Sequence, residues 1–113
     1  MLRSQLKSKI HRACVTDANV AYEGSITIPG DLMDAVDLWE GEKVLVASAT
    51  TGQRLETYAQ RGPADGRVVM NGGAALRIGV GERITILAWG LAAEPVTPRK
   101  VVCDERNAVV KAV

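Results

Sequence analysis

The chain has 113 residues, enough for one domain with a modest hydrophobic core. Apolar residues make up 47% of it and charged residues 24%, which is typical of a globular protein and excludes a disordered one. The formal net charge is +1, so there is no strong positive field to attract nucleic acid or an anionic membrane surface. We therefore expect neither of these among its partners.

The sequence indicates a cytoplasmic protein without a metal site. No apolar stretch approaches the roughly 20 residues that span a bilayer. Polar side chains interrupt the N-terminal segment at Arg3, Gln5, Lys7 and Lys9. A signal peptide is therefore not expected. Cys14 and Cys103 are too few for a disulfide framework and are not spaced as metal ligands, which predicts two reduced thiols.

The first elements in chain order are short and mostly β-forming. Residues 2–12 alternate roughly between apolar and polar side chains and allow either a strand or a helix. Residues 13–20 contain β formers, with a turn predicted at 17–19. Residues 25–28 predict a short strand that Pro29-Gly30 ends, since this dipeptide is a strong turn signal.

One short helix follows, and then the pattern returns to strands. Asp31 is predicted to cap an amphipathic helix over residues 32–38. Strands are expected over 43–49, 53–59, 67–70, 83–89, 99–103 and 108–112, and one helical turn over 74–77. Aromatic residues are only 4% of the chain and Phe is absent, so small aliphatic side chains must fill the core. This predicts a mainly β fold with one or two short helices, closed into a small barrel that hides its strand edges.

The most informative motif is Tyr22-Glu23-Gly24-Ser25, which comes soon after Lys9-Ile10-His11-Arg12. Alone, Gly-Ser is an ordinary turn dipeptide. Together with Thr57-Tyr58 and Asn71-Gly72, in this order and spacing, it resembles the self-cleavage site of the pyruvoyl-dependent aspartate 1-decarboxylase family. The resemblance covers residues 1 to about 89, and the tail from about residue 90 diverges from it.

The resemblance implies a single domain over residues 1–113 with a double-psi β-barrel fold and a homotetrameric assembly. It implies cleavage into a β chain, 1–24, and an α chain, 25–113, whose first residue becomes a pyruvoyl cofactor derived from Ser25. The activity implied is that of a lyase that decarboxylates L-aspartate to β-alanine and CO₂ through a Schiff base. In this family β-alanine feeds pantothenate and coenzyme A synthesis. The sequence leaves open whether a maturation factor assists the cleavage.

The chemistry of Gly24-Ser25 agrees with this resemblance. A serine hydroxyl can attack the preceding carbonyl and form an ester, and β-elimination then leaves dehydroalanine, which water hydrolyses to a pyruvoyl group. A preceding glycine gives the backbone the freedom that this rearrangement needs. The developing oxyanion also needs a hydrogen-bond donor. The resemblance assigns Thr57 to this processing, although a threonine in a strand is otherwise explained by β-propensity.

The resemblance also implies the site residues. Catalysis falls to Ser25 and to Tyr58 as the proton donor, and substrate binding to Lys9, Arg54, Thr57, Asn71, Gly72, Gly73 and Ala74. His11 and Tyr22 are further candidates. The planar fork of an arginine suits a substrate carboxylate. Each of these residues also has an ordinary reading, as a solvated charge, a turn asparagine or a structural histidine.

Strand geometry makes one further prediction about these residues. Successive side chains of a strand point to opposite faces, so Lys9 and His11 share one face and Thr57 points away from Tyr58. If Thr57 and Tyr58 serve one site, the strand must carry a twist or a bulge. Otherwise the two residues serve neighbouring sites of an oligomer.

Several positions depart from the family pattern. Ser48 and Thr51 stand where asparagine is usual, Gln60 and Thr85 where larger apolar residues are expected, and Leu76 where histidine is common. These changes leave open a related substrate, such as a substituted aspartate. Two other classes stay open from the sequence: an uncleaved β-barrel interaction module, and a DNA-binding barrel, which the near-zero net charge disfavours.

Overall fold

The computed structural model describes all residues from 1 to 113, and it is mainly β, as predicted. The strands are β1 (Arg3–Cys14), β2 (Asp17–Asn19), β3 (Ser25–Pro29), β4 (Lys43–Ser48), β5 (Arg54–Gly62), β6 (Val69–Asn71), β7 (Arg83–Ala92), β8 (Arg99–Cys103) and β9 (Val109–Ala112). The two helices are α1 (Gly30–Ala35) and α2 (Ala74–Arg77). Neither helix has the length and hydropathy needed to cross a membrane.

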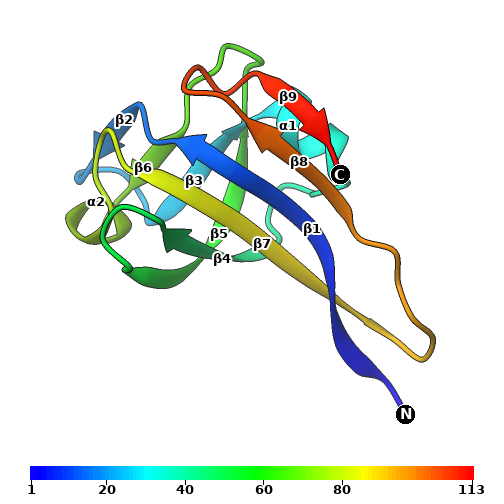
Figure 1. The fold of residues 1–113 in the computed structure, drawn as a ribbon. Helices are drawn as coiled ribbons and strands as arrows, with labels where there is room; N and C mark the ends of the chain where they lie inside the picture. Colours follow the sequence, from blue (N-terminus) through cyan, green and yellow to red (C-terminus); the bar gives the residue numbers. More distant parts are fainter.

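The nine strands form one mixed sheet in the order β2-β6-β3-β5-β4-β7-β1-β8-β9. Three pairings are parallel, namely β1 with β8, β2 with β6 and β3 with β5, and the other five are antiparallel. The sheet curls around the core, which leaves few free edges (Figure 1). This arrangement is consistent with the double-psi β-barrel that the resemblance implies.

Strand β1 is the longest element and combines two functions. Its C-terminal half belongs to the barrel. Its first residues and the end of β7 project from the body as a two-stranded ribbon (Figure 1). The pairing of β1 with β7 shifts register twice, between Leu6 and Ser8 and between Ile10 and Ala13. Such bulges bend a strand, which lets β1 leave the barrel and continue along the ribbon.

The core contains only aliphatic side chains, small residues, methionine and one cysteine. Its largest fully buried members include Ile10, Ile26, Ile84, Ile86 and Met70. The core therefore lacks Phe, as the composition predicted, and is filled by branched side chains from the inner face of short strands, such as Ile26 and Ile28 of β3 and Ile84 and Ile86 of β7. No buried side-chain nitrogen or oxygen lacks a hydrogen-bond partner. Cys14 and Cys103 are free, as expected, and burial raises the pKa of the Cys103 thiol to about 11.

Two local predictions are wrong. Residues 17–19 form strand β2, not a turn, because their backbone pairs in parallel with Val69–Asn71. Helix α1 begins at Gly30 after Pro29, without a side-chain cap from Asp31, and it ends at Ala35. It stops early because Asp37 adopts a left-handed φ of 54°, a conformation that cannot continue a right-handed helix.

Candidate active site

Ser25 is the first residue of β3 and is fully buried. Its hydroxyl donates a hydrogen bond to the carbonyl of Glu23 at 3.1 Å. The same oxygen accepts a hydrogen bond from the side-chain amide of Asn71 at 3.0 Å. A serine hydroxyl that is both buried and held on two sides has one orientation, so the protein fixes the position of this hydroxyl beside the Gly24 peptide.

Asn71 is held where it can do this by the pairing of β3 with β6, in which Ser25 and Asn71 are register partners. Its amide nitrogen also donates to the Thr27 hydroxyl at 3.0 Å. Asn71 does not have a positive φ, so it does not belong to a type I′ turn, which requires two such residues. The side chain instead serves the Ser25 hydroxyl.

The close approach of the chain to Gly24 explains why the residue after Asn71, Gly72, is a glycine. Its φ is +63°, and a Cβ there would lie 2.7 Å from the Cα and 2.8 Å from the nitrogen of Gly24. The backbone of Gly72 is itself fixed, since its N–H donates to the carbonyl of Asn19 at 2.8 Å. Only a residue without a side chain lets β6 end this close to the Gly24-Ser25 peptide.

A cavity of about 340 Å³ opens beside this peptide. Its lining residues come from the segment before β3, from β5, and from α2 with the Gly73 that precedes it: Gly24, Leu55, Glu56, Thr57, Gly73, Ala74 and Arg77. The cavity thus brings together Gly24, Thr57, Gly73 and Ala74, four residues that the sequence predicted for processing or substrate binding. It has room for a small amino acid next to the bond to be cleaved.

Lys9 and His11 lie elsewhere. As the strand period predicted, they share one face of β1, where they line a separate hollow of about 230 Å³ against β8, together with Lys100 and Val113. This hollow shares no lining residue with the cavity at Gly24. Partial burial, then the charges of nearby Lys9 and other basic side chains, hold the pKa of His11 below its ordinary value.

The remaining candidates are near in sequence but do not line the cavity. Arg54 is exposed at the first position of β5, and Tyr58 is half-buried on the same strand, opposite Lys43 of β4. Thr57 lines the cavity while Tyr58 does not. Tyr22 is half exposed in the turn before Ser25, and its carbonyl helps to form the wall against which Gly72 packs.

Three of the departures from the family pattern, Ser48, Thr51 and Thr85, make specific side-chain hydrogen bonds. The Ser48 hydroxyl donates to Glu82 at 2.6 Å, and the Thr51 hydroxyl reaches the same carboxylate oxygen at 3.3 Å. These bonds fix the turn after β4. Thr85 is hydrogen-bonded to the Nδ1 atom of His11 at 3.1 Å. None of these residues lines the cavity beside Gly24.

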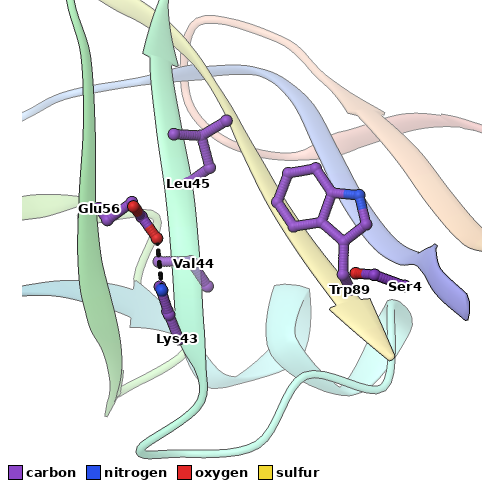
Figure 2. A pocket seen from close by; sticks show the side chains of 6 residues that line it. All are labelled: Ser4, Lys43, Val44, Leu45, Glu56 and Trp89. Atoms are coloured by element: carbon purple, nitrogen blue, oxygen red, sulfur yellow. Dashed lines mark ion pairs between the residues drawn. The ribbon is translucent and has the colours of Figure 1, made fainter. Parts of the chain in front are cut away.

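Another hollow, of about 300 Å³, lies on the outer face of β4, β5 and β7. Figure 2 shows Lys43 and Glu56 facing each other, with the indole of Trp89 on the other side. The Lys43 ammonium and the Glu56 carboxylate are 2.6 Å apart. The remaining lining residues are Ser4, Val44 and Leu45, and the hollow contains none of the residues that the resemblance assigns to the site.

Sequence reasoning missed three participants. The Glu23 carbonyl and the Thr27 hydroxyl complete the hydrogen-bond set of Ser25 and Asn71. The position of Thr27 two residues after Ser25, on the same face of a strand, was the available signal. Arg77 lines the cavity from the last position of α2. Its signal was its place one helical turn after the predicted Gly73 and Ala74.

The barrel and the fixed serine are together the features of a self-processing enzyme, and comparison with known proteins identifies its family. The profile of the aspartate decarboxylase family matches residues 1–110, which extends past the motifs that end near residue 89. The chain belongs to this family. It is 45% identical over 112 residues to the aspartate 1-decarboxylase of Pseudothermotoga lettingae, covering 96% of this chain and 97% of that protein. It is 44% identical to the protein of the same name from Bacillus cytotoxicus, covering 98% of this chain and 91% of that protein, and 43% identical to that of Shouchella clausii, with the same coverage.

Proposed function

We propose that the chain cleaves itself between Gly24 and Ser25 and then decarboxylates L-aspartate to β-alanine and CO₂. The observation that carries this proposal is the buried Ser25 hydroxyl, held 3.0 Å from the Asn71 amide and directly after a glycine that opens onto a cavity. Membership of the aspartate decarboxylase family and near full-length relatives of that name support the same activity.

Self-cleavage begins when the Ser25 oxygen attacks the carbonyl carbon of Gly24. The Ser25 nitrogen leaves that carbon, so an ester replaces the peptide bond. Loss of the α proton of Ser25 then expels the Gly24 carboxylate and leaves dehydroalanine. One water molecule converts this residue to a pyruvoyl group and releases ammonia. Asn71 and the packing of Gly72 against Gly24 orient the attack, and Thr57 stabilises the oxyanion from across the cavity.

The residues around Ser25 fit a pyruvoyl group at this position. The Asn71 amide, 3.0 Å from the Ser25 oxygen, is a donor for an oxygen of that group, and the cavity beside Gly24 gives a substrate access to it. Once formed, the pyruvoyl group supplies an electron sink for the loss of CO₂. Thr57, Gly73 and Ala74, which line the cavity, bind and orient the substrate. Tyr58, brought by a second copy of the chain, returns a proton to the carbon that has lost CO₂.

The substrate that fits best is L-aspartate itself. The changed positions Ser48, Thr51 and Thr85 are committed to Glu82 and His11 and do not line the cavity, so they give no reason to assign a substituted aspartate. Turnover of aspartate, 3-substituted aspartates and glutamate by one preparation tests this choice. A clear preference for any substrate other than aspartate contradicts it.

The active assembly is a homotetramer in which a second copy completes the site. Two observations support this part of the proposal. Lys9 and His11 line a hollow that has no residue in common with the cavity beside Gly24. The projecting ribbon exposes large apolar side chains, Leu2, Trp89 and Leu91, that a second copy could bury. Loss of activity on dilution to monomers would agree with a shared site, and full activity of a proven monomer would refute it.

The decisive experiment is the mass spectrum of the purified, denatured protein together with a β-alanine assay. Two fragments, 1–24 and 25–113, are expected, and the second should be lighter by one ammonia than a peptide that begins with serine. An intact chain without decarboxylase activity would favour an interaction module with the same fold. The two free cysteines agree with the reducing cytoplasm as the place of the reaction.

A further inference from the structure

The cavity beside Gly24 contains one cationic side chain, Arg77, and one anionic side chain, Glu56. The Glu56 carboxylate is already engaged, because the Lys43 ammonium binds it at 2.6 Å in the neighbouring hollow (Figure 2). Arg77 is therefore the one charged group of the cavity that has no counter-ion. A cavity with an uncompensated guanidinium favours an anionic ligand.

The fold holds Arg77 at the wall of the cavity. Ile78, the next residue, is fully buried, and its N–H donates to the carbonyl of Ala74 at 3.0 Å, which closes the single turn of α2. Ala74 itself packs against the core and lines the cavity. Both ends of the turn are thus anchored, so the backbone that carries Arg77 has one position next to the cavity.

The guanidinium itself is almost free. Its one side-chain hydrogen bond is a long one, 3.4 Å from Nη1 to the Oε1 atom of Gln53. No carboxylate lies within ion-pair distance of it, whereas Arg61 and Arg67 each bind an aspartate at about 3 Å. Most of the five N–H donors of Arg77 are available to a ligand, in a geometry that matches a carboxylate.

We infer that Arg77 binds the side-chain carboxylate of the substrate, the one that remains in the product. The inference rests on the proposed function, and what it adds is the residue that anchors the retained carboxylate. A cation bound to the departing carboxylate would stabilise a charge that disappears in the transition state, and this would slow the reaction. Bound to the retained carboxylate, it stabilises ground state and transition state equally and anchors the substrate.

This assignment separates Arg77 from Arg54, the arginine that the sequence favoured. Both arginines are exposed, but Arg77 lines the cavity together with Gly24 and Thr57, whereas Arg54 does not line it. The two arginines are compatible if Arg54 contacts the substrate from the rim. The specific claim is that Arg77 binds the substrate equally well in the ground state and the transition state. Loss of Arg77 should therefore raise KM and leave kcat unchanged.

The experiment compares R77Q and R77K with R106Q, a matched loss of one exposed arginine that lines no cavity near Ser25. Mass spectra first establish that every variant is fully cleaved. For R77Q we expect KM for L-aspartate to rise about tenfold with kcat within about twofold of wild type, since one charge-assisted contact is lost. R77K should lie between R77Q and wild type, and R106Q should match wild type.

Binding of succinate, a dicarboxylate without an amine, supplies a readout that does not depend on turnover. Calorimetry should show weaker succinate binding by R77Q than by wild type, and equal binding by R106Q. An unchanged KM and unchanged succinate binding in R77Q would overturn the inference, as would a fall in kcat at constant KM. If wild type itself is cleaved but does not turn over aspartate, the proposed function fails, while the succinate comparison still decides whether Arg77 binds carboxylates.

Discussion

Two regions of the molecule carry the residues that the family resemblance singled out, and they differ in completeness. In the first region, the Ser25 hydroxyl, its donor Asn71 and the close approach of Gly72 to Gly24 are all supplied by one chain. The hollow between β1 and β8 collects Lys9 and His11 beside further basic groups, and it contains no nucleophile. The first region is therefore organised for a reaction within the chain, and the second for holding an anion or a second chain.

This difference implies that self-cleavage and decarboxylation have different requirements. Cleavage needs only groups that one chain supplies, so variants in the β1–β8 hollow should still be processed. Under the proposed function, decarboxylation needs the cationic groups of that hollow as well, brought to Ser25 by another copy of the chain. Variants that act on one step but not the other can break or sharpen the comparison.

The largest effect is expected for Ser25→Ala. The variant keeps the buried position but loses the hydroxyl, so it can neither rearrange nor form the cofactor. The mass spectrum should show an intact chain, and β-alanine formation should be abolished. Ser25→Thr keeps a hydroxyl and serves as the control, with some cleavage expected. Cleavage of the alanine variant at the same bond would show that another group attacks Gly24.

The next largest effect is expected at Gly72, whose backbone packs against that of Gly24. Gly72→Ala places a methyl group within 3 Å of the Gly24 backbone at a φ of +63°, and we expect a loss of at least about 2 kcal/mol in the free energy of unfolding. Urea titrations in the Ser25→Ala background measure this on one uncleaved species. In the wild-type background the same change should slow or stop cleavage, because the scissile peptide is displaced.

Gly73→Ala is the matched control for this prediction. Gly73 has an ordinary helical φ of −60°, and no atom lies within 4 Å of the position that the alanine methyl group would occupy. Its stability should be unchanged or slightly higher, since alanine loses less conformational entropy on folding. Equal losses in both variants would mean that the close approach of Gly72 to Gly24 is not what matters.

A third prediction tests the division between the regions directly. Lys9→Ala should be cleaved as completely as wild type but should lose at least about tenfold in turnover, since a charge near a dianionic substrate is removed. Co-expression of Lys9→Ala with Ser25→Ala should restore activity at about one quarter of the sites if the chains mix at random. Activity that stays at the level of Lys9→Ala alone would place Lys9 outside a shared site.

The sequence predicted the strands well where local preference and tertiary pairing agree. Strand β8 has the expected bounds, and β4, β5 and β7 differ from them by a few residues. The prediction failed at residues 17–19 because aspartate and asparagine favour turns locally. There the pairing with β6 and the 3.0 Å bond from Arg67 to Asp17 favour an extended chain. Non-local pairing of this kind is invisible to a local pattern.

The site was predictable to a similar degree. Gly24, Ser25, Thr57 and Asn71 were selected by motif order, and the structure places them at one cavity or in direct contact. The role of Asn71 as a donor to Ser25 needs the register of β3 with β6, which no spacing reveals. Arg77 was missed for the same reason, because its neighbours in the cavity come from β5, some twenty residues away in sequence.

The smallest effect is a pH dependence confined to the second region. Burial, followed by the positive charges of Lys9, Arg12 and Arg83, holds the pKa of His11 below the value of 6.5 that it has in the unfolded chain. The unfolded chain therefore binds a proton more readily, so this contribution to stability is complete above pH 6.5 and falls as the pH drops below it. His11→Gln in the Ser25→Ala background should reduce the slope of unfolding free energy between about pH 7 and pH 5. Thr85→Val removes the hydroxyl 3.1 Å from His11 but leaves the burial of His11 and the nearby positive charges in place. The slope of its unfolding free energy against pH should therefore match that of the parent chain. His11→Gln alone should be cleaved as fully as wild type, because the hollow of β1 and β8 takes no part in fixing Ser25; slower cleavage would show that the two regions are coupled within one chain.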